Sequence, residues 1–316
     1  MRSRLLVRNA LVLATLAVSG VVGCVSGSGQ LTPDAPESPL LSRLWPNEDG
    51  NSWSYDYVSY VATETQEVPE AIARPADEIS YAEVEALLLA DAPLADTAAY
   101  FRAGTLEMRF DGRIAVRAGS KQRLRDTLIV DDGARAGSPV HERVPRALRK
   151  ARDDAFALLA NPTLLWGYSA FEKKGDWIGF YDEARRDSAF TLIKAPIESG
   201  EFFRHQFTRW GLFDETMAEY AWIAGGRSIE ASNGVLIEDA VAVIYVIYWR
   251  VSYNEGPDPG GVSDTYSAVI TYFAPDIGPV YHRWLGFFST DPARPEVRRT
   301  LYAEARLREF SVEAEQ

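Results

Sequence analysis

The run AVAVIYVIYWRVSY, residues 240–253, is the longest of the apolar segments in the second half of the chain. In an extended chain, successive side chains point to opposite faces, so both faces of this run are apolar. The odd positions are Val241, Val243, Tyr245, Ile247, Trp249 and Val251, and the even positions include Ala242, Ile244, Val246 and Tyr248. We therefore predict a central strand that is covered on both sides, either by helices and loops or by a bound apolar molecule.

The odd positions carry the larger side chains, and Tyr and Trp each combine an apolar ring with a polar atom that could orient a ligand. If a bound molecule covers one face, we expect it on this one. The predicted ligand-binding residues are Val243, Tyr245, Ile247 and Trp249.

Around this run, short apolar segments separated by Gly, Asp, Asn and Pro follow one another from residue 164 to residue 312. Many short strands at regular spacing are typical of a curled antiparallel sheet or an open barrel. Earlier in the chain, alternation from Trp53 to Val61 predicts a strand. Alternation on either side of Asp111-Gly112 predicts a hairpin with its turn at these two residues. The predicted fold class is α+β, mainly β, with two or three helices.

Helical signals appear in three places. Ser80 and Glu83 have the spacing of a capping box and predict a helix that begins there. A shorter helix is expected over 96–102, and a third in an insert near 134–162. The polar face of the third helix carries Arg146, Arg149, Lys150 and Arg152. These cations either pair with the protein's own carboxylates or contact a membrane surface or partner.

The N-terminus has three arginines, then an apolar stretch too short to span a bilayer, then Cys24, the only cysteine of the chain. The run Val21-Val22-Gly23-Cys24 resembles the lipobox of bacterial lipoproteins, whose cysteine is diacylated on sulfur and becomes the mature N-terminus. The resemblance implies a signal peptide at 1–23, a lipidated Cys24 with a flexible tether over 24–42, and one globular domain over 43–316. It also implies a location in the cell envelope. Val25 stands where an inner-membrane retention signal has Asp, which favours the outer membrane if the host has two membranes.

The composition of the chain limits the classes of partner and cofactor that we expect it to bind. The formal net charge is -12, so we expect no nucleic acid, and the membrane is expected through the diacylglyceryl group on Cys24. The lipid uses the thiol of Cys24, which leaves no cysteine for a disulfide or a nucleophile. The three histidines, His141, His205 and His282, lie in no zinc-binding motif, and we expect neither metal nor cofactor.

Two further stretches resemble catalytic motifs but lack residues that those motifs require. The segment 167–171 lacks the second glycine of a nucleophile elbow, and the prolines in 256–261 remove amide donors that a phosphate loop would need. We therefore predict a protein without enzymatic activity.

Several motifs occur in the same order as in a broad group of bacterial secreted lipoproteins. They are the opening Gly50-Asn51-x-Trp53-x-Tyr55, the Pro196-x-x-x-Gly200 turn, Gly234, and the closing Tyr272-Phe273-Ala274-Pro275-x-x-Gly278-x-Val280. The insert near 134–162 and Pro279 depart from that pattern. The resemblance implies a fold and a location, with no activity attached.

Two functions follow as alternatives. In the first, the sheet has a filled core and the protein is a structural or interaction component of the envelope. In the second, the curled sheet carries a lipid or another hydrophobic ligand. A hydrolase is a distant third.

Overall fold

The computed structural model describes residues 38–65, 67–75, 77–90, 98–116, 119–130, 170–181, 189–197, 201–209, 213–253, 262–289 and 298–312. Cys24 and the predicted insert helix lie outside these ranges. Within them the chain is mostly strand, as the sequence predicts, with three helices: α1 (Pro39–Leu44), α2 (Glu70–Ala73) and α3 (Tyr81–Leu89).

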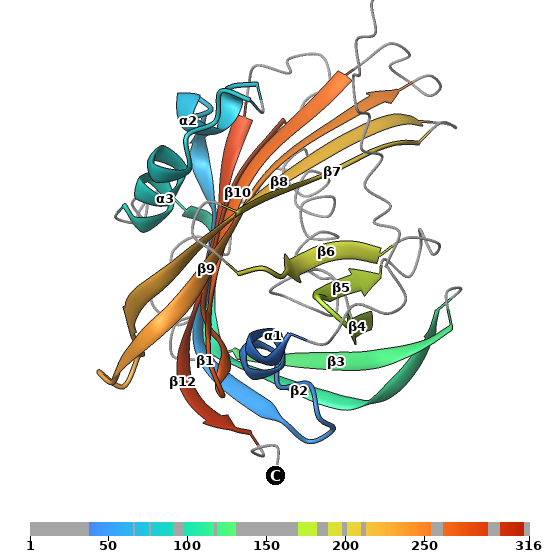
Figure 1. The fold of residues 1–316 in the computed structure, drawn as a ribbon. Coiled ribbons are helices and arrows are strands. Elements are labelled where there is room, and N and C mark those ends of the chain that lie inside the picture. Colours follow the sequence, from blue (N-terminus) through green and yellow to red (C-terminus); the bar gives the residue numbers. More distant parts are fainter. Residues whose placement is uncertain are drawn as a thin grey trace, which may run out of the picture.

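The strands form one antiparallel sheet that curls around a concave side (Figure 1). Its spatial order is β6-β5-β4-β3-β2-β1-β12-β11-β10-β9-β8-β7. The strands are β1 (Ser52–Thr65), β2 (Ala98–Val116), β3 (Gly119–Val130), β4 (Ala170–Lys174), β5 (Trp177–Tyr181), β6 (Ala189–Lys194), β7 (Glu201–Arg209), β8 (Phe213–Glu230), β9 (Leu236–Tyr253), β10 (Val262–Ala274), β11 (Gly278–Ser289) and β12 (Arg298–Ser311). Helices α2 and α3 lie on the convex side, and α1 lies on the concave side together with β4 to β6.

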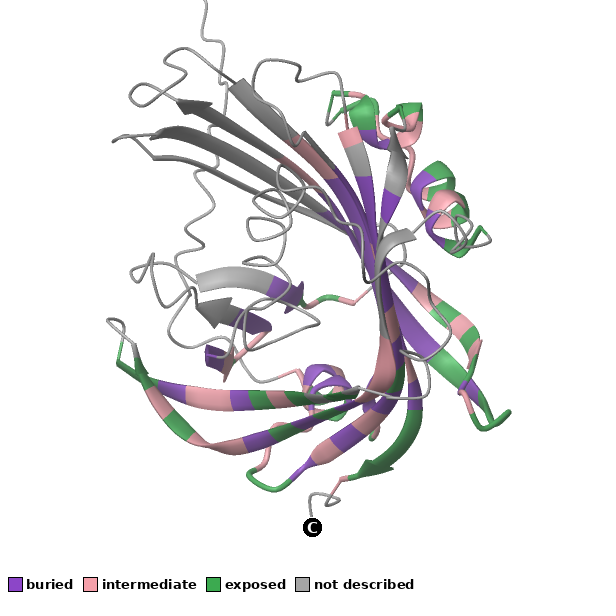
Figure 2. Cartoon of the chain, turned by 180° about the vertical axis from the view of Figure 1, so that it is seen from behind, coloured by how far each residue is buried: buried purple, intermediate pink, exposed green. Residues whose placement is uncertain are grey.

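Strand β9 is the central strand that the opening run predicts. It pairs with β8 on one side and β10 on the other, and every residue from Ala240 to Val246 is buried (Figure 2). Its two faces have different cover. Val241 pairs with Phe273, which contacts Trp45 on the concave side, whereas Ala242 pairs with Tyr272, whose hydroxyl donates to Glu85 of α3 on the convex side.

An aromatic cluster fills the concave side next to α1. Trp45 is 2% exposed, and its ring centroid lies 5.6 Å from Phe110 of β2, 5.2 Å from Phe171 of β4 and 5.9 Å from Phe273 of β10. One side chain thus joins three strands that are not neighbours in the sheet order. The area that these rings bury is the kind that dominates the stability of a core.

The opening and closing motifs of the resemblance are in direct contact. Trp53 donates a hydrogen bond from Nε1 to the carbonyl oxygen of Ile277 at 2.6 Å. The hydroxyl of Tyr55 donates one to the carbonyl oxygen of Pro279 at 2.8 Å. Gly278, between these two acceptors, has a φ of +93°, and an added Cβ there would lie 3.1 Å from the Trp53 ring. This glycine is required both for its backbone conformation and for its close approach to the indole.

Three local expectations are wrong. The segment 96–102 is not helical where it is described, because β2 begins at Ala98. The turn is not at Asp111-Gly112: β2 continues through these residues as a bulge, and Val116 pairs with Gly119 beyond it. Gly112 has a φ of +66°, so the Asp-Gly pair supplies the positive φ of a bulge instead of that of a hairpin turn.

The third concerns the start of α3. The helix begins after Ser80 as predicted, but the Ser80 side chain makes no capping hydrogen bond, and Glu83 pairs instead with Arg74 at 2.5 Å. The boundary of the tether also shifts. Residues 39–42, which we assigned to a flexible tether, belong to α1, because Leu41 is fully buried against the core.

Candidate functional site

The structure describes only part of the predicted sites. Cys24 and the basic set Arg146, Arg149, Lys150 and Arg152 lie outside the described residues. The four predicted ligand-binding residues are on β9, and three of their side chains are described.

Two of these three pack against the chain itself. Val243 is fully buried and Tyr245 is 7% exposed. The Tyr245 hydroxyl donates a hydrogen bond to the carbonyl oxygen of Leu192 on β6, which thereby covers the concave face of β9. The sequence left open whether protein or a bound molecule covers this face of the strand. At Val243 and Tyr245, protein covers it.

The concave face is less fully covered toward the second half of β9. Ile247 is half-buried and pairs with Ser267 of β10, which pairs in turn with Gly286 of β11. Trp284 is half-buried on the same face, and its Nε1 lies 3.3 Å from where a Cβ on Gly286 would be. This indole N–H is buried and has no hydrogen-bond acceptor among the described residues. These residues form the central concave patch: Ile247, Ser267, Trp284 and Gly286.

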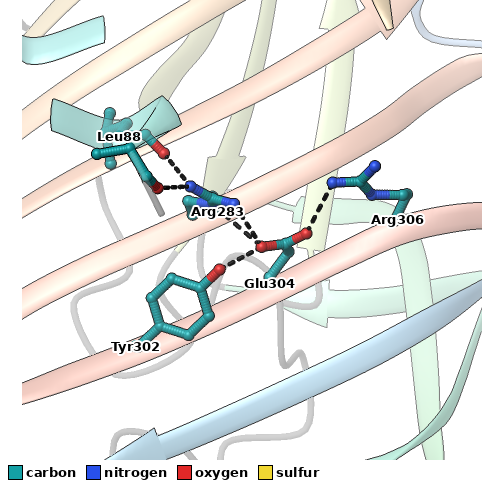
Figure 3. Close-up of polar contacts among 6 residues, drawn as sticks. Leu88, Arg283, Tyr302, Glu304 and Arg306 are labelled. Carbon is teal, nitrogen blue, oxygen red and sulfur yellow. Dashed lines mark hydrogen bonds and ion pairs between the residues drawn. The ribbon is translucent and has the colours of Figure 1, made fainter. Parts of the chain in front are cut away.

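The convex side carries a charged cluster beneath the C-terminal end of α3 (Figure 3). Arg283 donates from Nε and Nη2 to Oε2 of Glu304, at 3.1 and 2.7 Å. Tyr302 donates to the same oxygen, and Arg306 donates from Nη2 to Oε1 at 3.2 Å. The side chains of Arg283 and Glu304 are only 11% and 15% exposed.

Arg283 also closes the end of helix α3. Its Nη1 donates to the carbonyl oxygens of Leu88 and Ala90, at 2.6 and 2.7 Å. The last carbonyls of a helix have no partner within the helix, and a guanidinium satisfies them while favouring the negative end of the helix dipole. The cluster therefore attaches α3 to the sheet.

A second charged cluster holds the middle of α3. Arg227 of β8 donates to both oxygens of Glu85 at 3.0 Å and to the Tyr81 hydroxyl at 2.9 Å. The Tyr272 hydroxyl of β10 donates to Glu85 at 3.3 Å. Burial opposes the ionisation of Glu85, but hydrogen bonds from Arg227 and Tyr81 outweigh it and hold the pKa of this carboxyl below its usual value.

The same balance applies to Glu304. Burial raises its pKa, and the hydrogen bond from Tyr302 together with the charge of Arg283 lowers it further than burial raises it. Burial raises the pKa of Tyr81 to about 12 and that of Tyr281 to about 12. These groups keep one protonation state near neutral pH, which suits a structural connection between helix and sheet.

Among the side chains that the structure describes, His282 is the one buried histidine. Its Nδ1 lies 2.8 Å from Oγ1 of Thr271, within hydrogen-bond distance, and burial lowers its pKa to about 3. The imidazole is therefore neutral at physiological pH.

The surface of the described residues includes two open grooves. One, of about 520 Å³, crosses the start of β1, the end of β12 and the middle of β2 and β3, and is lined by Arg109, Arg125, Glu107, Glu309 and Phe310 among others. The other, of about 360 Å³, lies beside Glu304 and is lined by Asp56, Glu230, Ser232 and Arg306 among others. Both are mainly polar, so neither has the apolar lining of a lipid pocket.

Within the described ranges, no group of three His, Cys, Asp or Glu side chains is arranged to hold a metal ion. None of the described helices is long and apolar enough to cross a membrane. In comparisons with protein-family models, with curated proteins and with solved structures, no match to this chain is found.

The two charged clusters that attach α3 are not among the features predicted from the sequence. Arg283 and Glu304 each interrupt a segment that otherwise predicts an apolar strand, and a charge in such a position is the available signal. Their pairing could not be inferred from it, because 21 residues separate them and Leu88 is 195 residues from Arg283.

Proposed function

We propose that this protein is a bacterial cell-envelope lipoprotein without enzymatic activity, held to a membrane through a diacylglyceryl group on Cys24. Its domain acts as a scaffold that contacts other components of the envelope. The observation that supports the scaffold role is the filled part of the concave side, next to α1 and β6. Trp45 packs there between Phe110, Phe171 and Phe273, and β6 covers Tyr245.

The charged clusters on the convex side support the same role. They hold α3 against β8, β10, β11 and β12 through the buried ion pair of Arg283 and Glu304, the half-buried pair of Arg227 and Glu85, and the hydrogen bond from Tyr272 to Glu85. A helix attached in this way presents a rigid outer surface, with the side chain of Leu89 48% exposed. Rigid elements are suited to binding a partner because little conformational freedom is lost on association.

The anchor is tested by fatty-acid labelling in cells. The parent chain should incorporate labelled palmitate and lose its first 23 residues, whereas Cys24→Ala should remain uncleaved and unlabelled. Unchanged labelling of the variant would end the lipoprotein proposal. The scaffold role is tested on the purified chain: mass spectrometry of an organic extract should show no lipid in stoichiometric amount.

A second candidate function is carriage of a hydrophobic ligand, and the central concave patch favours it. Trp284 offers a buried indole N–H with no acceptor among the described residues, beside the half-buried Ile247. A ligand with an apolar chain and a polar head could satisfy that donor.

The matched variants Trp284→Phe and Trp53→Phe separate the two functions. Both lose an indole N–H, but Trp53 donates its own to the carbonyl of Ile277 within the fold. For a carrier, Trp284→Phe weakens uptake of a fluorescent fatty acid at unchanged stability, and Trp53→Phe lowers stability without changing uptake. If the parent protein takes up no fatty acid, the carrier function is excluded and only the scaffold role remains.

A further inference from the structure

The basic residues of this acidic protein are unevenly distributed. The whole chain has 33 Lys and Arg against 45 Asp and Glu. In the described residues of β2 to β6 and their turns, 98–116, 119–130, 170–181 and 189–197, nine basic residues face five acidic ones. Four of the five lysines of the chain lie there: Lys121, Lys173, Lys174 and Lys194. This part of the sheet is positive while the protein as a whole is negative.

Three arginines converge on one carboxylate at the bulge of β2. Arg109 and Arg125 are directly opposite each other in the ladder, and the carboxylate of Asp111 lies 3.7 Å from Arg109 and 2.5 Å from Arg125. Arg123 lies 3.6 Å from it. Like charges directly opposite one another destabilise a sheet, and one carboxylate neutralises only one of three guanidiniums. Against Asp111 alone the three guanidiniums leave two positive charges, and Glu107 and Glu309, which line the adjoining groove, reduce this excess.

Two exposed lysines flank Trp177 on the neighbouring strands. Lys174 of β4 and Lys194 of β6 both pair with Trp177 of β5, so the three residues form one row across the sheet. Directly opposite residues in a ladder point to the same face. Both lysines are exposed and Trp177 is buried, which leaves the two ammonium groups at the surface.

The chain enters the domain at this same end. The amide of Ser38, the first described residue, donates to the carbonyl of Gly175 at 3.3 Å, next to Lys174. Ser42 of α1 lies within hydrogen-bond distance of Lys173 Nζ, at 3.2 Å, and the amide of Gly112 donates to Asp49 at 3.1 Å. Residues 38–50 thus run along the basic part of the sheet, from the β4–β5 turn to the bulge of β2.

The tether leaves little distance between this end and the membrane. Thirteen residues, which include Gly, Ser and Pro, lie between Cys24 and Ser38, and a flexible segment of that length would have a root-mean-square reach of about 20 Å. The opposite end of β1 lies about 45 Å away along the strand. The tether therefore brings the basic end to the surface first, within a few Debye lengths of the headgroups.

We propose that this end of the domain docks on anionic lipid headgroups, with Arg109, Arg113, Arg125, Lys174 and Lys194 as the contacting cations. The inference rests on the proposed anchor at Cys24. The two acyl chains of a diacylglyceryl group are enough for stable anchoring, and a basic surface beside them adds attraction to anionic headgroups that orients the domain on the membrane. Docking also fixes the orientation of the domain, so that α2, which follows the far end of β1, faces away from the membrane.

Vesicle co-sedimentation tests the docking surface without the lipid. The chain from residue 24 onward, carrying Cys24→Ser, is mixed with phosphatidylcholine vesicles that contain either no phosphatidylglycerol or about 30 mol % of it. The test variant is Arg113→Gln with Lys174→Gln, since both side chains are exposed. The control variant is Arg74→Gln with Arg298→Gln, which removes the same charge near the opposite end, because Arg299 pairs with Thr65 there.

We expect the unmodified surface to bind the anionic vesicles only, and to release them as salt rises from about 0.05 to about 0.5 M. Each basic residue near such a surface strengthens binding about fivefold, so the test variant should bind at least about tenfold more weakly. The control variant should stay within about twofold of the parent. Equal losses in the two variants, or no preference for anionic vesicles, would overturn the docking surface.

The two proposals fail separately. The vesicle experiment uses a chain that carries no acyl group, so its outcome is independent of whether Cys24 is lipidated in cells. Vesicle binding that persists while fatty-acid labelling of the parent fails would overturn the anchor and leave the surface. Fatty-acid labelling of the parent without vesicle binding would overturn the docking surface and leave the anchor.

Discussion

Arg283 of β11 and Glu304 of β12 lie directly opposite one another in the ladder, and two guanidinium nitrogens of Arg283 donate to the same oxygen of Glu304. The third nitrogen binds the carbonyls of Leu88 and Ala90 at the end of α3. One buried side chain thus joins two strands and a helix. Burying such a pair is costly, and the hydrogen bonds that Arg283 makes to Glu304, Leu88 and Ala90 offset that cost.

Glu304→Gln should therefore lower the free energy of unfolding by about 3 kcal/mol, because it leaves the Arg283 charge buried without its counter-charge. Urea denaturation measures the change. The control is Asp276→Asn, which removes the pair with Arg43 at the surface, where the two side chains are 63% and 55% exposed. Exposed pairs contribute about 1 kcal/mol or less, so a loss as large as that of Glu304→Gln would contradict this account.

His282 should make stability fall as the pH falls from 7 to 5. Its pKa is about 3 in the folded protein and 6.5 in the unfolded chain, so between these values the unfolded state binds a proton that the folded state does not. Stability is fully present above about pH 6.5 and decreases below it, by about 2 kcal/mol at pH 5.

His282→Asn should reduce this difference between pH 7 and pH 5, whatever its effect on stability at pH 7. Glu85 and Glu304 act in another window. Their folded pKa values are below the usual value of 4.5, so their contribution is present above that value and is lost as the pH falls through the folded pKa. A variant that kept the full dependence between pH 7 and pH 5 would show that another group titrates there.

Gly278→Ala should destabilise the domain more than Gly234→Ala does. Both glycines have positive φ, +93° and +81°, so both substitutions carry a backbone penalty of about 1 kcal/mol. Only at Gly278 would the new methyl group meet neighbours, at 3.1 Å from Trp53 and 3.3 Å from Pro46. Thermal melting of the two variants isolates the packing contribution, and equal melting temperatures would show that Trp53 moves aside freely.

Trp45→Ala should lower the free energy of unfolding by about 3–5 kcal/mol, the range for a large aromatic side chain in a filled core. Truncation removes contacts with Phe110, Phe171 and Phe273 at once. Leu89→Ala is the control, because its side chain is 48% exposed and it should change stability by about 0.5 kcal/mol or less. A small effect at Trp45 would mean that the concave side tolerates a cavity, and would favour the carrier function.

Part of this fold could be read directly from neighbouring residues. The alternation of large apolar side chains over 240–253 predicts a strand that is buried on both faces, and Ala240–Val246 is buried throughout. Helix α3 was likewise predictable from its apolar spacing and its start after Ser80. These features follow from local periodicity, since residues two apart in a strand share a face and residues three or four apart in a helix do.

The tertiary structure decided what covers each face. Periodicity assigns Val243 and Tyr245 to one side, but β6, which lies 53 residues away at Leu192, determines that this side is packed by protein. The same limit explains the misplaced turn at Asp111-Gly112, where both a bulge and a hairpin accept the positive φ of glycine. Only pairing with β1 and β3 on either side selects the bulge.

The attachment of α3 and the junction between Trp53 and Gly278 are decided at the same level. The residues that interact there are 21 to 224 positions apart in the sequence. A charge within an apolar strand indicates that a partner is needed, and a glycine indicates an unusual backbone conformation, but neither identifies the residue that it contacts. The sequence by itself determined the mainly β character of the chain, the two buried faces of β9 and the acidic charge of the whole chain. The curl of the sheet then decided which of those faces meet, because the partners that cover them are far away in the sequence.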